Sequence, residues 1–349
     1  MALLVRNRAL RLAFAVTFGL TFEVLRGAAL PMLAPVIALQ LLAGTMRPPP
    51  LATIIMLLAI SAGASALAYF VSVISVNLPG AYALGVGMLY LWGFGLAFTP
   101  KGAPIGIMIV TMCVVVTSLS GVSTGLALGI VVELVFSVGL GALIVYLAHV
   151  CFPTPPDANI EDARPKPAPT ASMPAPARAL MATAIILPLH LYLNADGLAA
   201  LPVLLTTATM LRQPGISESQ RYCLGYAIGN ALGGAAAGVS VFIMLTHGNP
   251  LTLVATTAAV SLYFAWKVVQ AERWAPILLP GFVAYVVLFG LSLSPITPPG
   301  PPEVAERVIQ ILLAAVYSFC AASIAYPLFA RRSSQKSKGV TVPEEQNAT

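Results

Sequence analysis

The stretch GVSTGLALGIVVELVFSVGLGALIVYLAH, residues 121–149, is one apolar run whose only charged residue is Glu133. A helix needs about 20 apolar residues to cross a hydrocarbon core roughly 30 Å thick, so this run predicts a membrane-spanning helix. Small residues recur along it at a four-residue spacing, which predicts a flat seam for a neighbouring helix. They are Gly121, Gly125, Gly129, Ser137 and Gly141.

Glu133 is the candidate proton-coupling residue of this helix. It follows the start of the run by twelve residues, or about 18 Å at 1.5 Å per residue, which predicts a position near the membrane midplane. A carboxyl group inside a membrane helix is costly and therefore indicates function. The alternative is a neutral carboxyl group that only hydrogen-bonds to a neighbouring helix.

Composition predicts an all-α polytopic membrane protein whose main partner is the lipid bilayer. The chain has 349 residues, of which 58% are hydrophobic and 9% are charged, whereas soluble domains carry about 25% charged residues. The net charge of +6 does not indicate nucleic-acid binding, because nearly all of the Lys and Arg residues flank apolar runs, where they orient helices in the membrane.

Twelve apolar spans, six on each side of a Pro-rich segment, define the predicted domain organisation. Residues 1–151 form a first six-helix membrane repeat, 152–177 a cytoplasmic Pro-rich linker, 178–330 a second six-helix membrane repeat, and 331–349 a disordered cytoplasmic tail. Proline-rich segments form neither helix nor core. The predicted spans are 9–25, 28–46, 51–75, 81–99, 104–119 and 122–150, then 178–194, 197–212, 219–246, 250–269, 274–293 and 303–330.

The distribution of basic residues predicts the orientation of the chain. With a cytoplasmic N-terminus, 16 of the 18 Lys and Arg residues fall in cytoplasmic segments, and only Arg26 and Arg307 fall on the other side. This asymmetry follows the positive-inside rule. We therefore expect a multi-pass membrane protein with both termini and the linker in the cytoplasm.

The two halves read as copies of each other. At a shift of 171 residues, Leu30-Pro31 falls on Leu201-Pro202, Gly63-Ala64 on Gly234-Ala235, and Pro79 on Pro250. Because each copy has an even number of spans, the copies are parallel repeats, and such transporters place their sites near the midplane between the repeats. Chance similarity between apolar helices is the alternative.

No motif in the sequence predicts an enzyme, a metal site or a cofactor. The cysteines Cys113, Cys151, Cys223 and Cys320 are far apart and form no CxxC pair, and the three histidines are also scattered. There is no Walker A sequence to bind ATP and no GxSxG elbow. Any energy must therefore come from an ion gradient or from a partner protein.

Candidate substrate or gate residues are the polar groups in and beside the spans. Glu23 and Arg26 end the first span, where they are turn residues or an outer gate at which Arg26 meets an exiting anion. The equivalent turn of the second half holds Asn194 and Asp196. The second span of each half contains prolines, which kink helices and free backbone groups to line a cavity. These helix-break candidates are Pro31, Pro35 and Pro202, with Gln40 on the same span as the first two.

Five further candidates lie nearer the span ends. Arg212 and Gln213 end the eighth span, where Arg212 attracts an anionic substrate or only anchors the helix. His190 follows Pro188 and is either a proton relay or a packed, hydrogen-bonded group. Glu306 and Arg307 begin the last span. A pair between Glu133 and Arg307 is conceivable, although Arg307 should lie nearer the outer surface.

The chain resembles the fusaric-acid-resistance and aromatic-acid exporter superfamily. The resemblance rests on the Arg-led first helix, the Pro-containing second helix, Arg221-x-x-x-Gly225-x-x-x-Gly229-x-x-x-Gly233 at the start of the third, and Ala305-Glu306-Arg307-Val308 in the last. Larger members carry a sizeable cytoplasmic domain, whereas this chain has only the Pro-rich linker. It therefore resembles a short bacterial form.

The resemblance implies a proton-driven inner-membrane exporter of small organic, including aromatic, acids that works with a periplasmic membrane-fusion adaptor. Substrate would enter near Arg212 and occupy a cavity lined by the second, sixth, eighth and twelfth spans, while Glu133 exchanges a proton. A non-transporting membrane subunit that docks a partner, a passive channel and a membrane enzyme remain alternatives. A homo-oligomer is also left open.

Overall fold

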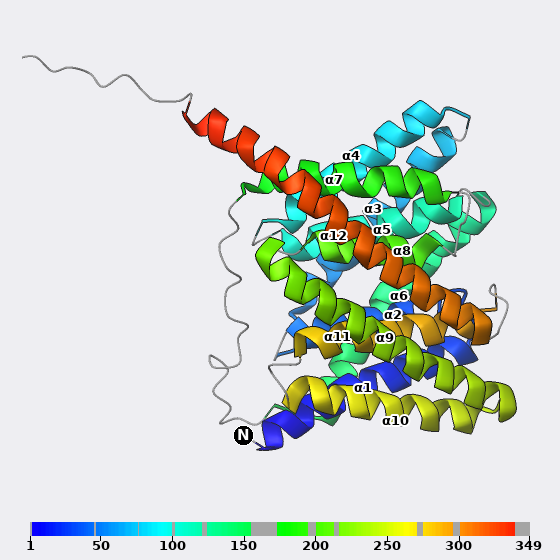
Figure 1. Cartoon of the computed structure of the whole chain (residues 1–349). Helices are drawn as coiled ribbons and strands as arrows, with labels where there is room; N and C mark the ends of the chain where they lie inside the picture. The colour runs from blue at the N-terminus through cyan, green and yellow to red at the C-terminus, as the bar shows by residue number, and fades with distance from the viewer. Residues whose placement is uncertain are drawn as a thin grey trace, which may run out of the picture.

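The computed structural model describes residues 2–338 except 45–46, 76, 100–101, 121–123, 155–172, 195–199, 213–215, 271–274 and 296–300. Its described part is all-helical and holds twelve α-helices (Figure 1). The predicted fold class is confirmed. The helices are α1 (Ala2–Leu25), α2 (Leu33–Gly44), α3 (Leu51–Ile74), α4 (Pro79–Ala97), α5 (Ala103–Ser120), α6 (Thr124–Cys151), α7 (Ala175–Leu193), α8 (Leu201–Leu211), α9 (Ile216–Thr246), α10 (Pro250–Gln270), α11 (Ala275–Ser292) and α12 (Pro301–Lys338).

Seven helices in the described part are long and apolar enough to cross a membrane, and they lie in α3, α4, α6, α7, α9, α10 and α12. In contrast, α2 has 12 residues and α8 has 11, about 18 and 17 Å of helix, which is well short of a 30 Å core. Both helices begin later than the predicted spans 28–46 and 197–212. The hairpins α1–α2 and α7–α8 therefore hold short second helices in both halves.

Proline explains why these two helices are short. Pro31 lies in the turn before α2, Pro35 in the first turn of α2, and Pro202 in the first turn of α8. Proline is tolerated in a first turn, where its missing N–H would have no helical partner anyway. These prolines therefore lie at the starts of two short helices. The sequence had suggested kinks within longer helices instead.

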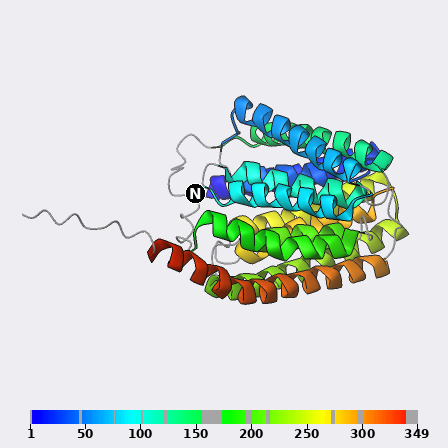
Figure 2. The same cartoon turned by 90° about the horizontal axis from the view of Figure 1, so that it is seen from above.

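The helix packing has the two-fold pattern expected of parallel repeats. Within the first half, α2 and α6 pack together and α3 packs on α5, and α8 with α12 and α9 with α11 repeat these contacts in the second half. Between the halves, α1 packs on α10 and α4 on α7, while α5 meets α8 and α11 meets α2. Figures 1 and 2 show the outer pairs on opposite sides of the bundle.

One close helix crossing, between α9 and α11, uses the glycines that the sequence places every four residues. A methyl group added at Gly229 would lie 2.1 Å from the Ile277 carbonyl oxygen, and one at Gly233 would lie 2.1 Å from that of Gly281. The backbones therefore touch, as small-xxx-small patterns allow. The predicted seam on α6 holds only in part, because Gly141 packs against α2 while Gly125 and Gly129 are exposed.

The first helix begins, and the last helix ends, at the same end of the bundle (Figures 1 and 2). Asn7 donates a hydrogen bond to the Pro153 carbonyl oxygen at 2.9 Å, which brings the end of α6 to this end as well. Each half has six helices, an even number, so the chain returns to the end of the bundle at which that half began. Which side of the membrane this end faces stays a prediction. The linker residues 155–172 and residues 339–349 lie outside the described part.

The last helix is longer than predicted. It continues to Lys338, whereas the sequence suggested a disordered tail from residue 331. Residues 331–338 contain neither proline nor glycine, and the first glycine is Gly339. Serine, lysine, arginine and glutamine cost a helix little, so nothing stops α12 before that glycine.

Candidate functional site: an arginine between two glutamates

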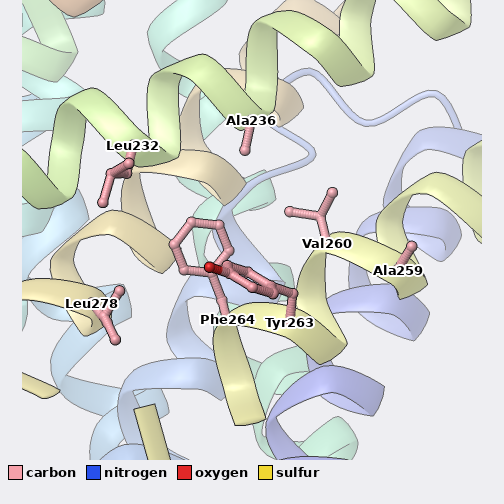
Figure 3. A pocket seen from close by; sticks show the side chains of 7 residues that line it. All are labelled: Leu232, Ala236, Ala259, Val260, Tyr263, Phe264 and Leu278. Atoms are coloured by element: carbon pink, nitrogen blue, oxygen red, sulfur yellow. The ribbon is translucent and has the colours of Figure 1, made fainter. Parts of the chain in front are cut away.

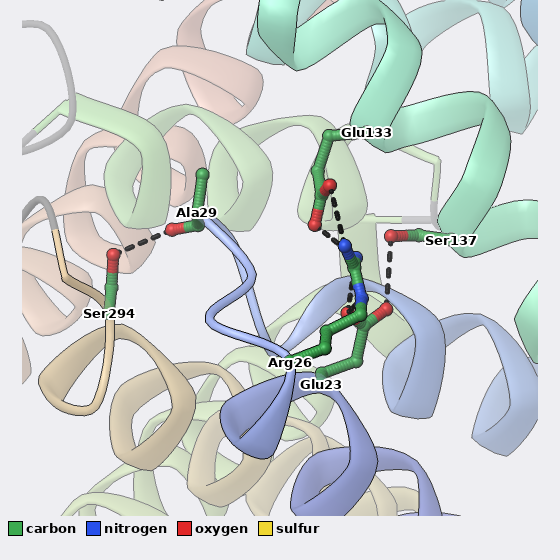
Figure 4. A network of polar contacts seen from close by, with 6 residues as sticks. All are labelled: Glu23, Arg26, Ala29, Glu133, Ser137 and Ser294. Atoms are coloured by element: carbon green, nitrogen blue, oxygen red, sulfur yellow. Dashed lines mark hydrogen bonds and ion pairs between the residues drawn. The ribbon is translucent and has the colours of Figure 1, made fainter.

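The candidate site begins at the turn that ends α1. Gly27 has a φ of 71°, in the left-handed region that glycine adopts without steric cost. The Arg26, Gly27 and Ala28 amides donate hydrogen bonds to the carbonyl oxygens of Phe22, Val24 and Glu23, at 3.0 Å each. This glycine-capped end turns the chain toward α2. It leaves the side chains of Glu23 and Arg26 facing α6 (Figure 4).

Arg26 lies between two carboxylates that come from different helices (Figure 4). Its Nε donates to Glu23 Oε2 at 2.6 Å, and one terminal nitrogen donates to Glu133 Oε2 at 3.1 Å. The other terminal nitrogen pairs with Glu133 Oε1 and with Glu23 Oε2. Ser137 Oγ lies 3.3 Å from the remaining oxygen, Glu23 Oε1. The cluster therefore ties α1 to α6 through charge-assisted hydrogen bonds.

The three charged groups differ in exposure. The Glu23 side chain is fully buried, whereas that of Glu133 is 14% exposed and that of Arg26 is 27% exposed. The guanidinium carbon of Arg26 also lies 4.4 Å from the ring centroid of the exposed Phe136. A cation above an aromatic ring is stabilised by the ring's negative face. An exposed arginine beside an exposed aromatic ring suits a ligand with a carboxylate and an apolar body.

The structure changes what the sequence suggested about depth. Glu133 follows the start of α6 by nine residues, or about 14 Å, and its carboxylate meets the end of α1 there. The α1–α2 turn thus lies inside the bundle, well short of the end at which α6 begins. Glu23, which the sequence placed at the end of the first span, is more deeply buried than Glu133. The partner of Glu133 is Arg26, while the Arg307 side chain lies outside the described part.

A second polar cluster surrounds His190, at the contact between α4 and α7. His190 is fully buried. Its Nδ1 lies 2.9 Å from the Tyr90 hydroxyl, and its Nε2 lies 3.2 Å from the Tyr82 hydroxyl and 3.1 Å from Thr117 Oγ1. Tyr82 also donates to Asn194 Oδ1 at 2.8 Å. These residues join helices of both halves.

The hydrogen bonds around His190 fit a neutral imidazole. The Thr117 hydroxyl donates to the Cys113 carbonyl oxygen and the Tyr82 hydroxyl to Asn194, so both oxygens are left to accept from Nε2–H. The Tyr90 hydroxyl then donates to Nδ1. Both ring nitrogens of His190 have a partner in this arrangement. His190 is therefore a hydrogen-bonded group that joins the two halves, and its role as a proton relay stays a prediction.

The remaining candidates lie apart from these two clusters. Arg212 ends α8, donates to Thr209 Oγ1 at 3.2 Å, and accepts a bond from Arg178 at its carbonyl oxygen. Arg8 makes the same contact to Ala43 at the end of α2 in the first half. Arg8 and Arg178 thus each cap a short helix at its negative end. Gln213 lies outside the described residues.

Two more candidates are exposed. Gln40 is exposed on α2. Glu306 is exposed on α12 and accepts a hydrogen bond from Gln310 at 3.2 Å. The sequence did not single out Tyr82, Tyr90 or Thr117, and its only signal for Ser137 was the spacing of small residues. Among the residues that the structure describes, no group of three or more His, Cys, Asp or Glu side chains could hold a metal ion.

A cavity of about 340 Å³ lies between α9, α10 and α11 (Figure 3). Its lining is apolar apart from the Tyr263 hydroxyl, and it lies within the second half, not between the halves where the sequence suggested a substrate cavity. Phe264, which stacks on Phe282, lies at the wall of the cavity. At the equivalent place in the first half, Gly93 lets α4 approach Val110 of α5 closely. The lining residues are Leu232, Ala236, Ala259, Val260, Tyr263, Phe264 and Leu278.

The fold and the charged cluster together define a polytopic helical membrane protein with a buried ion network. Residues 181–321, in the second half of the chain, match the family described as fusaric acid resistance protein-like, so the predicted resemblance is confirmed. Residues 8–148 match a family described as a protein of unknown function. The two matched segments cover equivalent parts of the two halves. No curated protein and no solved structure matches the chain.

The match to this family indicates a transporter-like or exporter-like membrane protein.

Proposed function

We propose that this protein is a secondary, proton-driven exporter of small organic acids, aromatic acids among them, in the bacterial inner membrane. The observation that carries this proposal is the partly exposed Arg26 between Glu23 and Glu133. A guanidinium group recognises a carboxylate with two parallel hydrogen bonds, which is how Arg26 now holds Glu133. The name of the matched family supports an organic acid as the substrate.

The second part of the proposal is how protons drive the transport. The pair between Arg26 and Glu133 ties α1 to α6 at the end of the bundle predicted to face outward. A proton arriving from outside neutralises one carboxylate of the cluster and removes its excess negative charge. The exposed side of the guanidinium then receives the exiting anion, whose ring packs near Phe136. The proton remains on the cluster as this end closes, and it leaves on the cytoplasmic side.

A periplasmic adaptor of the membrane-fusion type belongs to the same proposal, and it rests on the family resemblance alone. Purification of the full-length protein from gently solubilised membranes, followed by identification of the proteins that accompany it, tests this part. A stable adaptor complex supports it. A complex that forms without any acid transport would favour the alternative of a membrane subunit that only docks a partner.

Transport in vesicles tests the function itself. We would reconstitute the full-length protein in liposomes, load them with radiolabelled benzoate or fusaric acid, and impose a pH gradient. We expect gradient-dependent efflux that Arg26→Gln abolishes, because the amide cannot bind a carboxylate as a cation does. The matched control is Arg6→Gln, since Arg6 is exposed near the start of α1, and it should transport normally.

Two results would overturn the proposal. Efflux of the same size without a pH gradient would indicate a passive channel. Equal transport by the wild-type protein and Arg26→Gln would remove the cluster from the transport path.

A further inference from the structure

The charged cluster holds one more carboxylate than guanidinium, and no other described charge pairs with it, since Arg6, Arg8 and Arg11 lie near the start of α1. The helices packed against α1 are α2, α6, α10 and α11. The α2 and α11 sequences carry no charged residue, and α10 carries only Lys267, in its last turn. Besides Glu133, the titratable groups of α6 are Tyr146, His149 and Cys151, which all lie near its end. The cluster therefore has a net charge of −1 when both glutamates are ionised.

Such an uncompensated charge is costly away from water. Two carboxylates that share a site cannot both ionise easily, and desolvation adds to this cost. Arg26 offsets one negative charge only. One proton on the cluster restores neutrality, so the question is which carboxylate holds it.

The two carboxylates differ in how Arg26 binds them. Both oxygens of Glu133 pair with terminal nitrogens of Arg26, and the side chain is 14% exposed. Both features favour its ionised form. Arg26 approaches only Oε2 of Glu23, through Nε at 2.6 Å and through a terminal nitrogen. Oε1 of Glu23 is left facing Ser137, and the whole side chain is buried.

We propose that the exchangeable proton of this cluster resides on Oε1 of Glu23, which donates it to Ser137 Oγ, and not on Glu133. A serine hydroxyl accepts a hydrogen bond as readily as it donates one. The 3.3 Å contact between these oxygens therefore serves the protonated and the ionised carboxyl group alike. Glu133 stays ionised and holds Arg26 in place. This inference deepens the proposed function and rests on it, since this proton is the one that the exporter would exchange.

Infrared spectroscopy of the full-length protein in phosphatidylcholine nanodiscs tests the assignment without any transport. We expect the wild-type protein at neutral pH to show the C=O stretching band of a protonated carboxyl group. Glu→Asp changes preserve the charge count, but they move the band, because protonated aspartate and glutamate absorb at different frequencies. Glu23→Asp should therefore shift the band, and Glu133→Asp should leave it in place.

A third variant reports on the hydrogen bond itself. Ser137→Ala removes the acceptor next to Glu23 Oε1 and keeps the helix and the charge count. It should shift the same band to higher frequency. Because it changes a single hydroxyl group, it serves if Glu23→Asp does not fold.

Two results would overturn the assignment. One is the absence of a protonated carboxyl band in the wild-type protein, and the other is a band that moves in Glu133→Asp but not in Ser137→Ala. These results are distinct from a failure of the proposed function, which is an absence of acid transport in vesicles. If the protein shows the band but transports no acid, the proton assignment stands and the proposed function fails.

Discussion

At the scale of the residue, the chemistry of the chain is concentrated in two buried polar clusters at the ends of α1 and α7. The first cluster is charged and joins α1 to α6 within one half, whereas the second is neutral and joins the two halves. Glu23 and Asn194 occupy equivalent positions in the repeats, so the same place on the fold has become ionic in one half and amide-based in the other. Only the first cluster is charged, and the proposed proton exchange and anion binding rest on it.

The charge count of the first cluster gives a prediction about coupling. Glu23→Gln and Glu133→Gln each leave one carboxylate for Arg26, so each removes the excess charge that binds the proton. We expect both variants to lose most of the effect of a pH gradient on efflux in proteoliposomes. The thermal denaturation midpoint of each purified variant controls for folding. A gradient response equal to that of the wild-type protein in both variants would contradict the proton role of the cluster.

The charge count also predicts that the double variant Glu23→Gln/Glu133→Gln is less stable than the wild-type protein. It leaves Arg26 without an anionic partner, and an uncompensated charge inside a protein is strongly destabilising. Partial exposure of Arg26 reduces this cost. We still expect the double variant to lower the denaturation midpoint in detergent by more than the two single variants together. An additive effect would mean that the two glutamates act independently.

The second cluster predicts a loss of stability without a charge effect. Tyr90→Phe removes the donor to His190 Nδ1 and leaves a buried nitrogen unpaired, which costs about 1–3 kcal/mol. We expect a lower denaturation midpoint in detergent. Tyr192→Phe is the matched control, because Tyr192 is 82% exposed and should leave the midpoint unchanged. Equal midpoints for both variants would show that the hydrogen bond contributes nothing.

At the scale of the element, short helices and close crossings shape the bundle. Prolines start α2 and α8 late, and Arg8 and Arg178 cap the other ends of these helices. Glycines bring α9 and α11 into backbone contact. The first half brings α4 close to α5 at Gly93, whereas Phe264 lies at the equivalent place on α10 and borders the apolar cavity. The two halves therefore share one plan but differ in local packing.

The α9–α11 crossing can be tested by adding a single methyl group. Gly229→Ala would bring the new carbon to 2.1 Å from the Ile277 carbonyl oxygen, so the helices must separate. Overpacking of this kind costs about 1–3 kcal/mol, and we expect a lower denaturation midpoint. Gly63→Ala is the control, because nothing lies within 4 Å of an added methyl group there. It should leave the midpoint unchanged or raise it, since alanine favours helix.

At the scale of the whole molecule, the repeats explain how the two clusters come to lie in the bundle. The contact of α1 with α10 and the contact of α4 with α7 are equivalent in the two repeats. The first helix of each half therefore packs on the fourth helix of the other half. Rocking of one half against the other would slide these pairs, which is the motion expected of transporters built from repeats. The His190 cluster lies on one of these pairs.

The orientation of the bundle is a prediction at this scale. In a variant whose only cysteine is Cys151, which is exposed at the end of α6, a membrane-impermeant maleimide should react in inverted vesicles and not in intact spheroplasts. Asn77→Cys in a cysteine-free background is the matched control, because exposed Asn77 lies between α3 and α4 at the other end. It should react with the opposite preference. The reverse pattern would invert the topology predicted from the basic residues.

The sequence by itself determined the helical membrane class, the repeated plan of the two halves and the resemblance of the second half to a known family. These features are written in local patterns: long apolar runs, periodic glycines, early prolines and flanking basic residues. Only the tertiary structure decided that Glu133 is paired with Arg26 and that Glu23 is the more deeply buried of the two. The reason is that the α1–α2 hairpin ends well short of α6, so residues 107 positions apart meet inside the bundle. Apolar patterns fix the length of each helix, but the heights at which neighbouring helices end depend on how they pack.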